Sequence, residues 1–142
     1  MSTAIDKIQE ELISEFEFFD DWMEKYDYII SLGKSLPVID ANCKNEDHLI
    51  KGCQSKVWLN AEKDGDIIKF TADSDAVITK GIISLLIRVL SNQKAEDIRD
   101  ADLYFIDKIG LKEHLSPMRS NGLESMVKKM KLYGFAFSKA EI

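Results

Sequence analysis

The spacing of apolar residues predicts two helices in the first quarter of the chain. An amphipathic helix is expected over residues 3–17, with Thr3 and Asp6 as its start signal. Its apolar face consists of Ile5, Ile8, Leu12, Ile13 and Phe16. A second helix is expected from residue 20 or 21 to residue 32. Gly33 is placed to end that helix in a left-handed backbone conformation.

The next part of the chain predicts a small antiparallel sheet of about three strands. A polar surface loop over residues 38–46 leads to a first strand at His48–Ile50. Apolar and polar residues then alternate over residues 55–61, and the return strand is expected over residues 67–72. Asp64-Gly65 between these two runs is a hairpin signal, because tight hairpin turns need positive backbone angles.

Residues 76–90 are apolar nearly all round, which predicts a buried helix on which the sheet packs. Asp73-Ser74-Asp75 ends the preceding strand and offers the helix an N-cap. Gly81 inside the helix costs about 1 kcal/mol relative to alanine, and a close backbone approach would justify that cost. The same apolar surface fits either the core or a dimer interface, so a homodimer is among the expectations.

The last third of the sequence predicts further helices. A short helix is expected over Leu103–Gly110, closed by Gly110. Ser116-Pro117 is a helix start, and Asn121 with Glu124 offers a second start before a final helix that ends near Phe137. Two helices, then strands, then helices are segregated elements, so we expect one α+β domain over residues 1–142.

Composition excludes several classes of function. The net charge is -6, from 25 acidic and 19 basic residues, which argues against a nucleic-acid partner. No apolar run is long enough to cross a bilayer, and the first residues lack the features of a signal peptide, so we expect a cytoplasmic protein without a membrane partner. The spacing of the two cysteines and two histidines matches no zinc pattern, so no metal site is expected.

Cys53 is the candidate for chemistry. Gly52 allows a tight turn and close approach of another molecule, and Ser55 follows two residues later. Lys51 and Lys56 flank the cysteine and can lower the pKa of its thiol. A small buried hydrophobe is the competing interpretation for any free cysteine, and the local sequence leaves both open. No histidine and carboxylate pair lies nearby in the sequence, which disfavours a protease-like triad.

Four segments resemble one known family in the same order along the chain. Residues 50–58, Ile-Lys-Gly-Cys-Gln-Ser-Lys-Val-Trp, resemble the cysteine motif Gly-Cys-x-Ser-x-Val-Trp of the SufE family. Residues 73–82 resemble its Ser-Asp-Ala…Lys-Gly helix start, and residues 111–123 its His-Leu-Ser-Pro…Arg-Ser-x-Gly-Leu segment. Residues 24–37 are similar to its N-terminal helix. Together these segments span most of the sequence.

The resemblance implies a fold and a role. SufE-like proteins have a fold like that of the IscU-type scaffold, a small antiparallel sheet packed against helices. They take sulfur from a SufS-type cysteine desulfurase, stimulate that enzyme, and pass the sulfur to an iron–sulfur scaffold complex of the SufBCD type. The pyridoxal phosphate (PLP) belongs to the desulfurase, so the resemblance implies a sulfur carrier without a cofactor of its own rather than a stand-alone enzyme.

Site roles carry over by position. Cys53 is expected to be the persulfide acceptor, with Lys51, Gly52 and Ser55 supporting its loop. Arg119 is expected to supply a fixed cation beside the sulfur, although a surface arginine at a helix end explains it equally well.

Three further positions belong to the matched segments. His114 is expected either to assist the chemistry or, as the more frequent case, to make a structural hydrogen bond. Asp75 is expected to be a helix cap. Lys80 is expected to lie at the surface, with partner contact as the alternative.

Two other functions stay open at this stage. An IscU-like metal or iron–sulfur scaffold would use Cys43, Cys53 and His48 or His114 as ligands. A cysteine hydrolase would need His114 beside Cys53, with an orienting carboxamide or carboxylate. Cys43 lies outside the matched motif, and is interpreted as a loop thiol or as a resolving cysteine for Cys53.

Overall fold

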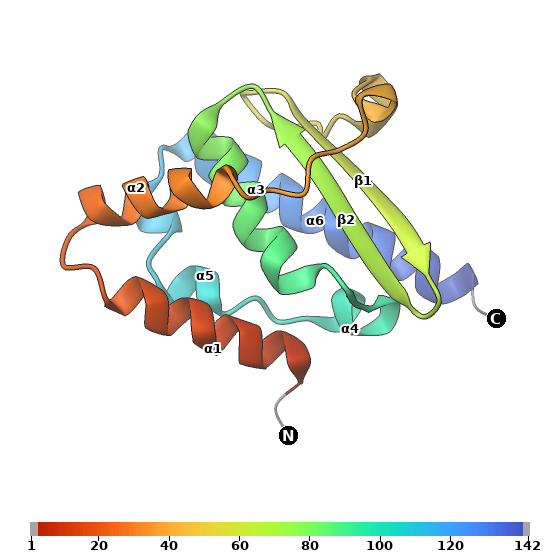
Figure 1. Ribbon diagram of the computed structural model, residues 1–142, viewed down its shortest axis with the longest axis horizontal. Coiled ribbons are helices and arrows are strands. Elements are labelled where there is room, and N and C mark those ends of the chain that lie inside the picture. Colours follow the sequence, from red (N-terminus) through yellow and green to blue (C-terminus); the bar gives the residue numbers. More distant parts are fainter. Residues whose placement is uncertain (1–2, 141–142) are drawn as a thin grey trace.

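The computed structural model describes residues 3–140 and has an α+β architecture, as the sequence predicts (Figure 1). The helices are α1 (Ala4–Glu17), α2 (Trp22–Gly33), α3 (Val77–Leu90), α4 (Ala95–Asp100), α5 (Phe105–Lys108) and α6 (Pro117–Ala140). The strands are β1 (Val57–Asp64), β2 (Ile67–Ser74) and β3 (Gln93–Lys94). Short 3-10 helices span Ala41–Cys43, Glu46–His48 and Lys112–His114.

The start of α1 confirms the capping signal in the sequence. The Thr3 side chain accepts a hydrogen bond from the Asp6 backbone N–H at 3.1 Å, and the Asp6 carboxylate accepts one from the Thr3 N–H. Such reciprocal bonds satisfy N–H groups that have no partner within the helix. Helix α2 begins after Asp21, whose carboxylate caps the Glu24 N–H at 2.9 Å.

The crossing of α2 and α3 explains two glycines. Gly33 does not end α2 in a left-handed conformation; it is the last helical residue. A Cβ at Gly33 would lie 3.0 Å from the backbone nitrogen of Gly81, and a Cβ at Gly81 would lie 2.2 Å from the Ile29 carbonyl oxygen. Both glycines are therefore needed for contact between the helices. The close approach predicted for Gly81 is confirmed, and the stop signal predicted for Gly33 is wrong.

The sheet has the order β1-β2-β3 and is antiparallel throughout. Strands β1 and β2 pair from Val57 opposite Ser74 to Asp64 opposite Ile67, and Gly65 at φ 64° occupies the turn. The first strand predicted at His48–Ile50 is not formed. In that segment only Leu49 forms a bridge, to Trp58, because the chain turns away at the next residues. The third strand is instead β3, which pairs with Ile67 and Ile68.

Helix α3 is the centre of the core. In Figure 1 it runs between α2 and the β1–β2 hairpin, with α6 behind the hairpin. Its side chains Ile82, Ile83, Leu85, Leu86, Ile87, Val89 and Leu90 are buried within the single chain. The sheet also contacts α6, since the rings of Phe70 and Tyr133 lie 6.3 Å apart. The apolar surface of α3 is therefore used by the core.

The C-terminal predictions are confirmed in part. Gly110 closes the short α5 region at φ 74°, and the Ser116 hydroxyl caps the Arg119 N–H at the start of α6. The second helix start at Asn121 is wrong, because α6 runs without interruption through it. Within residues 3–140 no helix has the length and apolar character that a membrane-spanning helix needs.

Candidate functional site

Cys53 lies in a loop over residues 51–56 whose ends are held together. The Ile50 N–H donates a hydrogen bond to the Val57 carbonyl at 2.8 Å, next to the Leu49–Trp58 bridge. Gly52 has φ 93°, a backbone conformation that favours glycine. A Cβ at Gly52 would also lie 2.5 Å from the Ser125 hydroxyl oxygen on α6. The backbone angle and the contact with Ser125 therefore both favour glycine where the loop packs against α6.

Asp75 fixes the second end of this loop. Its carboxylate accepts a hydrogen bond from the Lys56 N–H at 3.0 Å, and its own N–H donates to the Lys56 carbonyl at 3.2 Å. The Ser74 hydroxyl donates to the same carbonyl at 2.8 Å. The prediction that Asp75 caps α3 is wrong, because the cap position is Ala76 and its side chain makes no capping bond. Asp75 bonds across to the loop instead.

The Cys53 thiol is half-buried under α6. Its sulfur donates a hydrogen bond to the Gly122 carbonyl at 3.7 Å. Beside it lies a hollow of about 10 Å³, close to the space of one water molecule. The lining residues are Cys53, Gln54, Ser55, Thr79, Ile82, Met118, Arg119, Gly122 and Met126. This hollow has room for an added atom on the sulfur and excludes a substrate the size of a metabolite.

Burial controls the protonation of this thiol. Desolvation raises the pKa of Cys53 above its ordinary value, so the thiol carries its proton at neutral pH in this conformation. The prediction that Lys51 and Lys56 lower this pKa is wrong. Both lysine side chains are exposed, and water screens exposed charges strongly.

The outer side of the loop is open. A surface hollow of about 490 Å³ is lined by Glu46, Asp47 and residues 49–56. A second hollow of about 550 Å³ shares part of this lining and extends to Lys128, Lys129 and Leu132 on α6. Cys53 thus lies in a thin loop between a small internal hollow and a wide external surface. Another protein could contact the loop from outside.

The sequence matches the SufE family, described as the Fe-S metabolism associated domain, over residues 10–133. The chain belongs to the SufE family. This membership associates the protein with iron–sulfur metabolism.

Curated relatives agree with the family match. The chain is 40% identical over 127 residues to an uncharacterized SufE-like protein of Rhizobium etli, covering 86% of each chain. It is 37% identical over 134 residues to an uncharacterized SufE-like protein of Rhizobium meliloti, covering 91% of this chain and 93% of the relative.

A solved structure shares the fold. The solution structure of a hypothetical protein from Thermus thermophilus has a TM-score of 0.75 and 17% sequence identity. The similarity covers 91% of this chain and 94% of that one. At this level of identity the likeness describes the fold alone.

The structure brings some of the SufE motif residues together and separates others. Arg119 and Ser55 line the same hollow as Cys53, although the Arg119 side chain is exposed. His114 lines neither the internal hollow nor the two outer hollows at the loop. It stacks on Trp22 at 4.0 Å and is hydrogen-bonded through Nδ1 to the Gly110 carbonyl at 2.9 Å. A histidine base beside Cys53, which a hydrolase needs, is not found there.

Lys80 and Asp73 form an ion pair near the start of α3, with 3.2 Å between Nζ and the carboxylate. Lys44 contacts the same carboxylate at 2.9 Å. Partial burial opposes ionisation of Asp73, but hydrogen bonds from Lys44, the Ser74 N–H and Lys80 hold its pKa below the ordinary value. Lys80 thus contributes to local structure at the edge of the site.

Thr79 is a site residue that the sequence reasoning missed. It is 6% exposed and lines the Cys53 hollow from the first turn of α3. A polar residue in a helix that is apolar nearly all round was the available signal.

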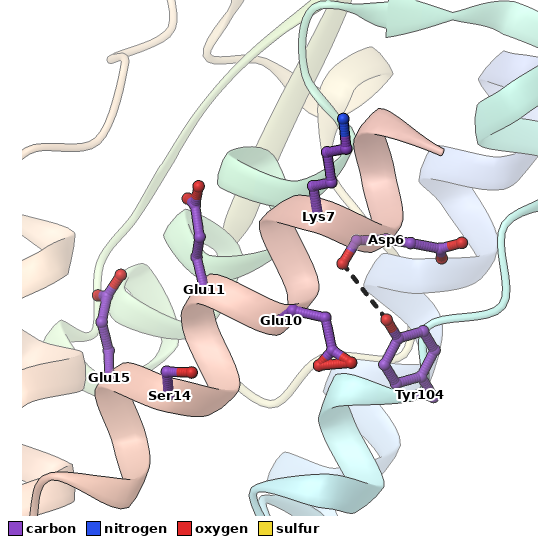
Figure 2. Close-up of a pocket in the computed structure, with 7 residues that line it drawn as sticks. All are labelled: Asp6, Lys7, Glu10, Glu11, Ser14, Glu15 and Tyr104. Atoms are coloured by element: carbon purple, nitrogen blue, oxygen red, sulfur yellow. Dashed lines mark hydrogen bonds between the residues drawn. The ribbon is translucent and has the colours of Figure 1, made fainter. Parts of the chain in front are cut away.

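A much larger hollow, of about 710 Å³, lies on α1 and has a different character (Figure 2). Its lining residues are Asp6, Lys7, Glu10, Glu11, Ser14, Glu15 and Tyr104, with the Tyr104 hydroxyl donating to the Asp6 carbonyl at 3.3 Å. It contains carboxylates and no thiol, so it offers no sulfur chemistry.

The residues proposed as scaffold ligands do not form a metal-binding group in this structure. Within residues 3–140, no three His, Cys, Asp or Glu side chains are grouped so that they could hold a metal ion. Cys43 is a free cysteine at the end of a 3-10 helix, and His48 is hydrogen-bonded to Asn45 at 2.9 Å. The geometry therefore gives no support to the scaffold alternative.

Proposed function

We propose that this protein accepts sulfur on Cys53 from a SufS-type cysteine desulfurase, stimulates that enzyme, and passes the sulfur to a SufBCD-type scaffold. The observation that carries the proposal is the position of Cys53, on a loop between an outer surface and an internal hollow about the size of one water. Such a hollow suits a cysteine that carries one added atom. Membership of the SufE family supports the link to iron–sulfur metabolism.

The transfer is a thiol–persulfide exchange. The Cys53 thiolate attacks the outer sulfur of the donor persulfide, E–S–SH. A new S–S bond forms at Cys53 while the donor's S–S bond breaks, giving Cys53–S–SH and the thiolate E–S⁻. The proton lost by Cys53 balances the charge on the leaving thiolate, and there is no net oxidation or reduction. This exchange needs no histidine base, which agrees with the position of His114 away from the loop.

Attack requires a change in the loop. The thiol is half-buried and protonated in this conformation, whereas the reacting form must be an accessible thiolate. Outward movement of residues 51–56 removes the desolvation that raises the pKa. Binding of the desulfurase to the outer surface supplies the free energy for this movement.

After transfer the loop returns and the outer sulfur enters the hollow. Apolar side chains, among them Ile82 and Met126, exclude water and reductants from it. Arg119 at the rim supplies a cation that favours an anionic sulfur. The PLP remains on the desulfurase, and this chain contributes only the carrier cysteine and its shelter.

The test is direct detection of the persulfide. Incubation with a SufS-type desulfurase, PLP and cysteine is expected to add about 32 Da, one sulfur, to Cys53. The Cys43→Ser variant is the matched control and is expected to gain the same mass, whereas Cys53→Ser is expected to gain none. The proposal fails if the natural chain gains no sulfur, or if Cys53→Ser gains as much as the natural chain.

A further inference from the structure

Thr79 is only 6% exposed, and its hydroxyl makes no hydrogen bond within residues 3–140. A fully enclosed hydroxyl without a partner would cost about 1–3 kcal/mol. No fully enclosed side-chain oxygen or nitrogen in the described residues lacks a partner. The Thr79 hydroxyl therefore reaches open space, and the hollow that Thr79 lines is the one beside Cys53.

The surroundings of Thr79 favour a negative charge. Thr79 is the third residue of α3, and the first N–H bond of this helix runs from Lys80 to the Ala76 carbonyl at 2.9 Å. The N–H groups of residues 77–79 thus have no partner in the described chain, and no side chain caps the helix. Unpaired N–H groups and the helix dipole give this end a partial positive charge.

The Thr79 hydroxyl is not used by the resting thiol. The Cys53 sulfur donates to the Gly122 carbonyl instead, so the Thr79 hydroxyl is available to an atom that is added to the sulfur. Ile82, Met118 and Met126 in the lining offer no strong donor. Among the lining side chains that do, Gln54 and Arg119 are exposed and Ser55 is half-buried, whereas Thr79 is buried.

We propose that the Thr79 hydroxyl donates a hydrogen bond to the outer sulfur of a Cys53 persulfide and holds that sulfur, as the anion, inside the hollow. The proposal rests on Cys53 as a sulfur acceptor, and adds the residue that retains the cargo. The persulfide Cys53–S–SH releases its proton to solvent, and the resulting Cys53–S–S⁻ accepts the hydrogen bond; no other bond forms or breaks. A hydrogen bond to an ionised acceptor is about twice as strong as a neutral one.

The test compares variants that differ in one hydroxyl. Thr79→Val keeps the shape of the side chain and removes the donor, whereas Thr79→Ser keeps the donor. Each full-length protein is loaded with sulfur, separated from the donor, and exposed to dithiothreitol while mass spectrometry follows the remaining persulfide. We expect about tenfold faster loss from Thr79→Val, as for loss of one hydrogen bond to a charged group. Thr79→Ser is expected to stay within about twofold of the natural chain.

A second measurement separates this role from a structural one. Because the resting thiol bonds to Gly122 and not to Thr79, the alkylation rate of unloaded Cys53 is expected to be the same in Thr79→Val and the natural chain. Faster alkylation in parallel with faster persulfide loss would mean that the loop had loosened, and would overturn the proposal. Equal persulfide loss from both proteins would overturn it as well. If Thr79→Val does not fold, Thr79→Ala provides the same comparison.

The way in which Cys53 is loaded with sulfur allows the role of Thr79 to be tested separately from the proposed function. Inorganic polysulfide loads Cys53 without any desulfurase, so persulfide retention is measured even if transfer from the enzyme fails. Loading by polysulfide but not by a SufS-type enzyme would count against the proposed function alone. Normal enzymatic loading with equal persulfide loss in Thr79→Val would count against the role of Thr79 alone.

Discussion

Glycines allow two close contacts in this protein, one between α2 and α3 and one between the Cys53 loop and α6. The two contacts differ in how much space remains beside them. At the α2–α3 crossing, backbone meets backbone, with the Cβ position of Gly81 only 2.2 Å from the Ile29 carbonyl oxygen. At the Cys53 loop, Gly52 meets a side-chain hydroxyl, and the Cβ position of Gly122 lies 3.5 Å from the Cys53 sulfur. The first contact leaves no space between the two backbones and fixes how α2 and α3 cross. The second lies beside the small hollow at Cys53, and the proposed function requires it to open.

The largest loss of stability is expected from a substitution at the α2–α3 crossing. Gly81→Ala has to push α2 away from α3, since the clash is with a backbone atom that has no alternative rotamer. We expect a fall of about 3 kcal/mol or more in the free energy of unfolding, measured with urea. Alanine normally stabilises a helix by about 1 kcal/mol relative to glycine, so the sign of the effect is diagnostic. Unchanged or higher stability would mean that the crossing is not tight.

A smaller loss is expected at the loop. Gly52→Ala meets an unfavourable backbone angle and the Ser125 hydroxyl, and should lower the free energy of unfolding by about 2 kcal/mol. Gly65→Ala is the matched control, because Gly65 also has a positive φ of 64° but no heavy atom within 4 Å of its Cβ position. Adding Ser125→Ala should recover the contact part of the loss only. Equal losses at positions 52 and 65 would remove the contact with α6 from the explanation.

Loss of the hydrogen bonds that hold the Lys56 end of the loop is expected to change mainly the accessibility of the Cys53 thiol. Asp75→Ala removes the carboxylate that accepts the Lys56 N–H, at a cost of about 1 kcal/mol in stability. The alkylation rate of Cys53 should rise severalfold in a Cys43→Ser background, because the loop opens more often. Ser74→Ala removes a second bond to Lys56 and should act in the same direction. An unchanged alkylation rate in both variants would show that this end does not control opening.

The ion pair between Glu15 on α1 and Arg88 on α3 is expected to contribute less to stability than either glycine contact. The hydrogen bond from Arg88 holds the pKa of Glu15 below its ordinary value of 4.5. The pair therefore stabilises the fold fully above that pH, and loses its effect as the pH falls through the lowered pKa. Because both side chains are a third exposed, Glu15→Gln should cost under about 1 kcal/mol at pH 7. Urea unfolding should show this difference shrinking in acid; a constant difference would contradict it.

The smallest effect on stability is expected at Gly122. Its Cβ position makes only an ordinary contact with the Cys53 sulfur, and alanine favours the helix, so Gly122→Ala should leave stability equal or slightly higher. Gly122 also lines the hollow that we propose for the outer sulfur, so the added methyl group should reduce the space there. Persulfide retention under dithiothreitol should therefore fall while the melting temperature does not. Retention equal to that of the natural chain would show that the outer sulfur lies elsewhere.

Local signals in the sequence predict local structure well here. The Thr3–Asp6 capping box, the turn at Gly65 and the Ser116-Pro117 helix start each depend on residues a few positions apart, and all three are found. The predicted helix stop at Gly33 is wrong, because glycine is needed there for close contact with Gly81, which is remote in the sequence.

Contacts between residues that are remote in the sequence also explain the wrong predictions for the sheet and the site. His48–Ile50 has the composition of a strand, but only Leu49 bridges to β1, and the third strand β3 forms at the opposite edge, where the chain after α3 returns to Ile67 and Ile68. The motif predicts Cys53 as the candidate residue, whereas its raised pKa depends on burial that no motif encodes. Asp75 looks like a cap, but its partner Lys56 lies across the loop. Such pairings are visible only once the chain has folded.

The half-buried, protonated state of Cys53 also bears on oxidative damage. Peroxides convert accessible thiolates to sulfenic acids, and further oxidation of these is irreversible. A thiol that keeps its proton and turns towards Gly122 is a poor target for such oxidants. If the loop opens on a partner as proposed, Cys53 would be nucleophilic only during that encounter and protected from oxidants between encounters.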